Sequence, residues 1–323
     1  MTFNKNIEIK FYKLLFFYIP KCYIMSICVK KGGVILARKL FCDISPTCYK
    51  ISEKKEILLR NIKDFFSKEK FAKERSKEEL PNIVKSHTSI LIRKLHGVDI
   101  KLQENKVTNI MIGCTKINGL IVHPGETFSF WKLMGPSKRK YGYKEGLIIA
   151  RNGMGKGYGG GICQLANMVH YLVLNSPLEV TELHHHSDAL FPDERRRVPF
   201  GTGTSVWYNN SDYRFKNTTD QDVQILLWVE NGELCGELRS ERAFPCRYKL
   251  VEEDNHFRKE GDKYYRISKV YRIVTDRLTN EELYKELILD NHSAVLYDYS
   301  LIPKEQIRND EDVGEIKENS TSK

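Results

Sequence analysis

The sequence lacks a long uninterrupted apolar run. Residues 11–29 are apolar and aromatic, but two lysines and a proline interrupt them, and the longest clean run is Leu14–Ile19. A membrane-spanning helix needs about 20 apolar residues, and the core of a signal peptide needs about 7–15. No small-residue cleavage site follows this segment. Because a clear signal peptide is missing, the sequence predicts a cytoplasmic protein.

The sequence also lacks closely paired cysteines. No two of its eight cysteines have the Cys-x-x-Cys spacing of a zinc ribbon or a dithiol redox motif. The chain is too long to be a small disulfide-stapled domain, so we expect a reducing compartment and mostly inert, buried thiols. We expect no cofactor and no bound metal. The cysteines are Cys22, Cys28, Cys42, Cys48, Cys114, Cys163, Cys235 and Cys246.

Most of the chain has almost no net charge. Residues 101–323 hold 31 Lys and Arg against 32 Asp and Glu, whereas residues 1–100 hold 21 against 10. A basic arm of this kind favours a solvated Lys-rich helix; a weak contact with a membrane surface or an anionic polymer is the alternative. No nucleic-acid-binding motif accompanies the charge, so nucleic acid is not an expected partner.

Apolar periodicity predicts three helices. The first covers residues 52–79 and ends before Pro81; the second spans 107–117, ends at Asn118-Gly119 and makes Cys114 a core thiol; the third spans 162–173. Alternating or β-branched segments predict strands at 88–95, 120–122, 178–186, 203–208, 222–229, 247–252, 263–275 and 294–300, with an extended segment at 127–131.

These elements predict an α+β fold with an antiparallel β-rich core, in which a glycine-rich loop precedes a cysteine-bearing helix. We divide the chain into a basic, partly helical region (1–84), a central domain (85–235), a β-rich C-terminal extension (236–308) and a polar, disordered tail (309–323).

Cys163 is the leading candidate for chemistry. It follows the run Gly159-Gly160-Gly161 at the predicted start of the third helix. The positive end of the helix dipole and the free N–H groups there favour a thiolate and accept an oxyanion. The glycines allow a substrate backbone to approach, and Gln164 offers a side-chain donor. A small residue packed between loop and helix is the alternative interpretation.

A nucleophilic cysteine needs a base. His184 and His186 alternate with Leu183 and His185 on the next predicted strand, so they share a face with Glu182. A dyad of Cys163 with either histidine is one hypothesis; partly exposed histidines, or a zinc pair completed by Cys163, are the others.

Two further residues follow a turn at 209–211. Asp212 either orients the histidine or caps the turn. Arg214 either binds a substrate carboxylate through two hydrogen bonds or forms a surface ion pair.

Several strings together resemble the VanW family, which is named after an accessory protein of vancomycin-resistance clusters. They occur in the family's order within residues 85–230. The strings are Gln103-Glu-Asn-Lys-Val-Thr-Asn109, Ile117-Asn-Gly-Leu-Ile-Val-His-Pro-Gly-Glu-Thr-Phe-Ser-Phe130, Gly142-Tyr-Lys-Glu-Gly146, Gly159-Gly-Gly-Ile-Cys-Gln-Leu165, Glu182-Leu-His-His-His-Ser187 and Asp212-Tyr-Arg-Phe-Lys-Asn217.

The resemblance implies a link to peptidoglycan and glycopeptide resistance. Some relatives with the glycine–cysteine motif are peptidoglycan L,D-transpeptidases that use this cysteine as the nucleophile. By resemblance, Cys163 attacks a stem-peptide carbonyl, a histidine of 184–186 is the base, and the wall-active role requires export. A non-catalytic module that binds cell-wall peptides or precursors is the alternative. The chain departs from the family pattern at Leu183, where Arg is usual, and at Gly203, where Asp is common.

Overall fold

The computed structural model describes residues 23–30, 33–93, 99–150, 153–185, 188–189, 192, 198–208 and 210–308. The predicted tail (309–323) and His186 lie outside these residues. Internal contacts divide the chain into two units, Met1–Lys68 and Glu69–Lys323. Among the described residues, no helix is long and apolar enough to cross a membrane.

The first unit contains a β-hairpin and one long helix. Strands β1 (Tyr23–Lys30) and β2 (Gly33–Leu40) pair antiparallel, and a short 3-10 turn, η1 (Phe41–Asp43), leads to α2 (Pro46–Phe66). Ser45 caps α2 by accepting a hydrogen bond from the Cys48 N–H at 3.1 Å, and Pro46 occupies the first turn, where no N–H is needed.

The predicted helix at 52–79 is wrong at its end, because α2 stops at Phe66. The following segment pairs with the second unit's sheet instead of continuing the helix. Phe71 bridges Thr127 and Arg75 bridges Leu120. The backbone groups of this segment find their hydrogen bonds on strands about 50 residues away, which local periodicity does not reveal.

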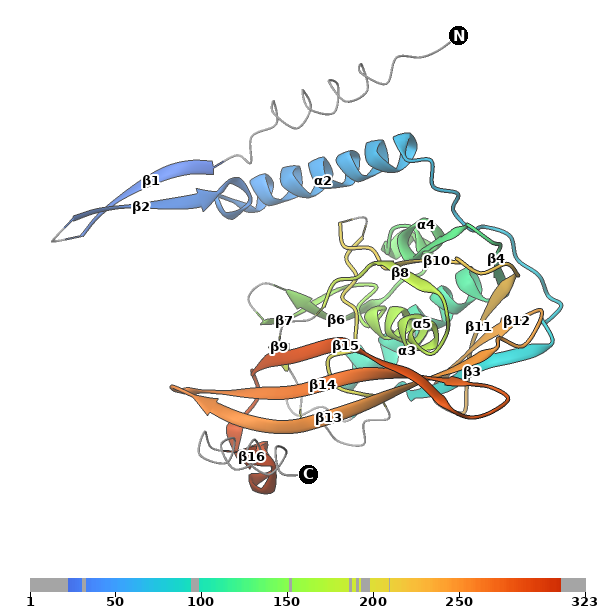
Figure 1. The fold of residues 1–323 in the computed structure, drawn as a ribbon. Helices are drawn as coiled ribbons and strands as arrows, with labels where there is room; N and C mark the ends of the chain where they lie inside the picture. The colour runs from blue at the N-terminus through green and yellow to red at the C-terminus, as the bar shows by residue number, and fades with distance from the viewer. Residues whose placement is uncertain are drawn as a thin grey trace, which may run out of the picture. The chain divides into compact units, whose positions relative to one another are not determined.

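The second unit contains a four-stranded antiparallel sheet with two helices packed on it (Figure 1). Its order is β3 (Asn82–Ile90), β12 (Glu233–Ser240), β11 (Val223–Glu230) and β4 (Leu120–Val122). The helices are α3 (Ile100–Ile117) and α5 (Cys163–Leu174). Met168 of α5 lies directly over Gly236 of β12, where an added Cβ would come within 2.8 Å of it.

Smaller elements complete this layer. β5 (Thr127–Ser129), β10 (Arg214–Lys216) and β8 (Glu179–Glu182) form a three-stranded sheet, and β6 (Glu145–Ala150) pairs with β7 (Gly153–Tyr158). The short helices are α4 (Phe130–Met134) and η2 (Arg139–Tyr141). A continuous core that includes Phe128, Tyr213 and Phe215 joins the two sheets and both long helices.

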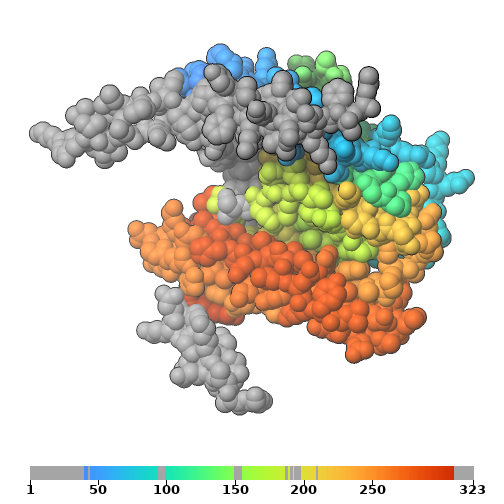
Figure 2. All heavy atoms as spheres, turned by 45° about the horizontal axis from the view of Figure 1, so that its top comes forward, coloured from blue at the N-terminus to red at the C-terminus, as the bar shows by residue number. Residues whose placement is uncertain are grey.

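The C-terminal region is a second, mostly antiparallel sheet. Its long strands are β13 (Cys246–Glu260), β14 (Lys263–Asp276) and β15 (Glu282–Val295); β16 (Ile307–Arg308) and β9 (Asp188–Ala189) add to its edges in parallel. Two turns, η3 (Tyr299–Leu301) and η4 (Lys304–Gln306), precede β16. These strands form the orange and red face of Figure 2 beside α5, and Arg272 Nη1 donates to the Ser176 carbonyl at 3.3 Å.

The α+β class with many antiparallel strands is confirmed. The helices at 107–117 and 162–173 and the strands at 120–122 and 222–229 agree with α3, α5, β4 and β11. The predicted strand at 203–208 is wrong, since its described pairing is a single bridge from Trp207 to Ser211. The strand predicted at 178–186 ends at Glu182, and the one at 294–300 gives way to η3.

Candidate functional site

The glycine turn before α5 needs unusual backbone angles. Gly159 has φ +80° and Gly161 has φ +91°, a left-handed region that favours glycine. α5 then begins at Cys163, and Ile162 precedes it without a side-chain cap. The turn therefore places Cys163 at the first position of a 12-residue helix.

The chain itself fills the space beside two of these glycines. A Cβ on Gly160 would lie 2.2 Å from the backbone of Gly146, and one on Gly161 would lie 2.1 Å from the Lys106 side chain. Asn109 Nδ2 also donates to the Gly160 carbonyl at 2.9 Å. Glycine is therefore needed at both positions because another part of the same protein packs against them.

We expect Gly160→Ala to lower the free energy of unfolding by about 3 kcal/mol, because two backbones would have to separate to admit the methyl group. Gly155→Ala is the matched control. Its Cβ would meet only the Ile148 side chain at 3.6 Å, so a change within about 0.5 kcal/mol is expected. Urea unfolding measures both; equal effects would mean that the Gly146–Gly160 contact is not tight in solution.

The Cys163 side chain is partly exposed, and its thiol is hydrogen-bonded to the protein backbone. Its Sγ donates a long hydrogen bond to the Val206 carbonyl at 3.9 Å. Burial raises the pKa of Cys163, and backbone hydrogen bonds at Val206 and Cys163 oppose this rise only in part. Desolvation of the charged form therefore opposes the thiolate that the helix dipole was expected to stabilise, and that thiolate stays a prediction.

Residues 204–206 lie between His184 and Cys163 and contact both. The Ser205 N–H donates to the His184 carbonyl at 2.6 Å, and the next residue, Val206, accepts from Cys163. The same segment is held to α5 by Asn167, whose Oδ1 accepts from the Thr204 N–H at 2.7 Å. Residues 204–206 thus connect the histidine-bearing segment to the first turns of α5.

The His184 ring is oriented by Glu182. Its Nε2 lies 2.9 Å from Glu182 Oε1, which also accepts from the Asp212 N–H at 3.1 Å. Among the described residues, no hydrogen bond joins His184 to Cys163; the Nδ1 atom of His184 is the ring nitrogen that Glu182 does not hold. In the described part of the chain, no three His, Cys, Asp or Glu residues are grouped to hold a metal ion.

Asp212 is fully buried at the centre of a hydrogen-bond network. It accepts from Ser129 Oγ at 2.6 Å, the Trp131 N–H at 3.0 Å and Arg214 Nε at 2.8 Å. Its partners in the described residues include no histidine. Asp212 therefore links α4 and β5 to β10, and Glu182 stands in the position that the sequence analysis gave to Asp212.

Arg214 and Gln164 are held by the protein itself. Arg214 pairs with Asp212 and lies 3.5 Å from Glu182, with its side chain only 10% exposed. Gln164 Nε2 donates to Ser89 Oγ and to the Ile90 carbonyl, both at 2.9 Å. The contacts of Gln164 join the start of α5 to β3. The side chains of Arg214 and Gln164, which were expected to bind a substrate, are thus bound to other residues of the protein.

Two buried ionisable residues near this turn have no counterpart among the predicted site residues. His170, two helical turns after Cys163, has a pKa lowered to about 3 by burial and by His185, and its Nδ1 lies 3.2 Å from the Tyr213 hydroxyl. Lys106, beneath Gly161, has a pKa lowered to about 8 by burial and by Arg93. The apolar periodicity gave no signal for them, because neither residue is among the apolar positions that predicted the two helices.

The region that contains this site is similar in sequence to known proteins. Residues 105–239, which include the glycine turn, Cys163, His184 and Asp212, match the family model described as VanW like protein. The chain is also 27% identical over 227 residues to the vancomycin B-type resistance protein VanW of Enterococcus faecalis (strain ATCC 700802 / V583), covering 70% of this chain and 82% of that protein. Residues 105–239 belong to the VanW-like family.

A second relative matches the chain over a shorter length. The uncharacterized protein YoaR of Bacillus subtilis (strain 168) is 32% identical over 143 residues, which is 44% of this chain and 46% of that protein. No solved structure matches the chain. The name of the Enterococcus relative links the VanW-like family to vancomycin resistance.

Proposed function

We propose that the VanW-like domain transfers an acyl group of a cell-wall stem peptide through a thioester at Cys163. The observation that carries the proposal is the path from Cys163 through residues 204–206 to His184, whose ring is held by the Glu182 carboxylate. A thiol, an imidazole and an orienting carboxylate are the groups that cysteine acyl transfer requires.

The reaction starts from a neutral thiol, because burial raises the pKa of Cys163. Sγ–H leaves the Val206 carbonyl and gives its proton to His184 Nδ1, while Sγ attacks the peptide carbonyl. The N–H of Cys163, at the first position of α5, stabilises the oxyanion. The peptide C–N bond then breaks, and the leaving amine takes the proton from His184. A second stem's amine attacks the thioester carbonyl and gives a proton to His184. The C–S bond breaks, the new amide leaves, and the proton returns from His184 to Sγ. The substrate lies in the cell wall, so the proposal includes export.

A non-catalytic module for the same peptides is the second candidate. The raised pKa of Cys163 favours it, because a thiol that is harder to ionise attacks a carbonyl more slowly. In this role the Asp212–Arg214–Glu182 network shapes a rigid binding surface, and no covalent intermediate forms.

The two candidates differ in whether an adduct forms on Cys163. Incubation of the full chain with purified stem peptides is expected to give a thioester adduct by intact-protein mass spectrometry. Cys163→Ala is expected to lower adduct and amide formation by about 10³-fold or more, because the nucleophile is lost. Cys246→Ala is the matched control, since Cys246 is another partly exposed free thiol, on β13, and should leave the adduct unchanged.

The contrary results are distinct. An adduct that survives in Cys163→Ala would rule out this nucleophile. Stem peptide that binds wild type and Cys163→Ala equally, with no adduct on either, would establish the non-catalytic module. Wild-type protein that neither binds nor reacts with stem peptides would end both candidates.

A further inference from the structure

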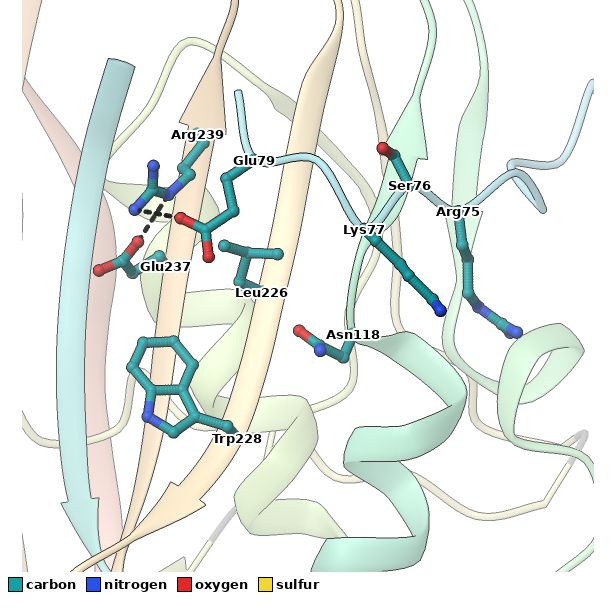
Figure 3. Close-up of a pocket in the computed structure, with 9 residues that line it drawn as sticks. All are labelled: Arg75, Ser76, Lys77, Glu79, Asn118, Leu226, Trp228, Glu237 and Arg239. Carbon is teal, nitrogen blue, oxygen red and sulfur yellow. Dashed lines mark hydrogen bonds and ion pairs between the residues drawn. The ribbon is translucent and has the colours of Figure 1, made fainter. Parts of the chain in front are cut away.

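A pocket of about 700 Å³ opens on the second unit, between residues 75–79, the end of α3 and strands β11 and β12 (Figure 3). None of the residues described around Cys163 lines it. Its volume falls within the range of about 300–1,000 Å³ that small-molecule sites occupy. The pocket lies within residues 69–323, so one compact unit forms it.

One wall of the pocket is an exposed aromatic ring. Trp228 is 36% exposed, although the five residues before it on β11 are all buried. Its indole N–H donates to Glu230 Oε2 at 3.3 Å, which restrains the ring. Leu226 lies two residues earlier, on the same side of the strand, and also lines the pocket. Together they offer an apolar surface with a polar edge, suited to the C–H face of a sugar ring.

The centre of the pocket is polar and partly neutralised. Arg239 donates to Glu237 Oε2 at 2.7 Å and lies 2.9 Å from Glu79 Oε2 (Figure 3). Asn118 accepts from the Leu227 N–H through Oδ1 at 2.9 Å, and this leaves its Nδ2 as a donor. Carboxylate oxygens and an amide N–H group are the partners that sugar hydroxyl and acetamido groups need.

The remaining wall carries positive charge. Arg75 and Lys77 lie on the other side of Asn118 from Trp228 (Figure 3), and neither has a carboxylate partner in the part of the chain that the structure describes. With Arg239 paired to two carboxylates, the lining has three cations and two anions. One negative group on the ligand balances this charge, whereas the two carboxylates repel a polyphosphate or nucleic acid.

We infer that this pocket binds an acidic saccharide: the sugar ring stacks on Trp228, its polar groups bond Asn118 and the Glu79–Arg239–Glu237 cluster, and its carboxylate pairs with Arg75 and Lys77. This site is separate from the acyl-transfer proposal and does not depend on Cys163.

The test compares two sugars that differ in one carboxylate. N-acetylmuramic acid carries a lactyl carboxylate that N-acetylglucosamine lacks. Isothermal titration of the full chain is expected to give at least about tenfold tighter binding of the acidic sugar. The double variant Arg75→Gln/Lys77→Gln should reduce the affinity for the acidic sugar to that for the neutral sugar, because only the charge pairing is removed. Lys138→Gln/Arg139→Gln removes the same charges from exposed positions outside the pocket and should change nothing.

The aromatic wall is tested separately. Trp228→Ala should weaken both sugars by about tenfold, and Trp228→Phe should retain most of the affinity because a ring remains. Undiminished binding to Trp228→Ala would overturn the inference. So would equal binding of inorganic phosphate and the acidic sugar, which would show only an anion site. Absence of N-acetylmuramic acid binding to wild type would overturn it outright.

Discussion

Replacing Asp212 with alanine is expected to lower the free energy of unfolding by about 3–5 kcal/mol. The carboxylate is fully buried and accepts from Ser129, Trp131, Tyr213 and Arg214. Its removal takes the 2.8 Å carboxylate partner away from a buried guanidinium and leaves the Trp131 and Tyr213 N–H groups without this acceptor. Unpaired buried donors and charges account for the largest single-residue losses of stability.

The matched control for this change is Asp220→Ala. Asp220 also pairs with an arginine, Arg242 at 3.1 Å, but its side chain is 86% exposed. Asp220→Ala should change the free energy of unfolding by no more than about 0.5 kcal/mol, because water replaces Asp220 around the Arg242 side chain. Chemical denaturation of both variants measures the difference. Similar small losses would mean that water enters the Asp212 network.

A second substitution at this position, Asp212→Asn, concerns the candidate site. It retains the size of the side chain and one acceptor oxygen and removes the negative charge. Since the described partners of Asp212 include no histidine, its role is to position Glu182 and Arg214, which its backbone N–H and its carboxylate contact. The orientation of the His184 ring depends directly on Glu182 at 2.9 Å.

Local periodicity was sufficient to predict the two long helices of the VanW-like domain, but the short helix α4 at Phe130–Met134 was expected to be extended. The apolar stripe of residues 107–117 and the glycine turn before Cys163 predicted α3 and α5 with their ends within a few residues, except that α3 begins earlier, at Ile100. Cys114, which was expected in the core, is buried, and its pKa is raised to about 12 by burial. These features depend on neighbours along the chain, so the sequence contains the information directly.

Features that depend on distant segments were missed. Residues 71–75 look helical by composition, but their backbone pairs with Thr127 and Leu120. The protonation of Cys163 depends on distant segments, and Val206, 43 residues later, accepts a hydrogen bond from the sulfur. Asp212 was one candidate for the carboxylate that orients His184. Its carboxylate instead accepts hydrogen bonds from Ser129 and Trp131, about 80 residues upstream. Burial and partner choice are tertiary properties.

Acidification from pH 6.5 toward pH 3 is expected to remove about 4–5 kcal/mol of stability through His170 alone. The pKa of this fully buried imidazole is lowered to about 3 in the folded protein, against a model value of 6.5. Between these values the unfolded chain binds a proton that the folded chain does not. Stability from His170 is therefore complete above pH 6.5 and is lost as the pH falls toward 3, with a slope of at most about 1.4 kcal/mol per pH unit.

Replacement of His170 with glutamine removes the titration while retaining a polar group beside the Tyr213 hydroxyl. The variant is expected to be less stable at pH 7, because a buried, packed ring is lost, but to show a flatter dependence on pH. Urea unfolding from pH 7 to pH 5 in both proteins measures the difference in slope, in which the carboxylate titrations common to both cancel. Val169→Ala is the control, since Val169 is fully buried on the same helix and does not titrate; it should lower the stability but retain the wild-type slope. Parallel curves for wild type and His170→Gln would show that the imidazole takes up its proton without unfolding, and α5 would then have to open to water next to Tyr213.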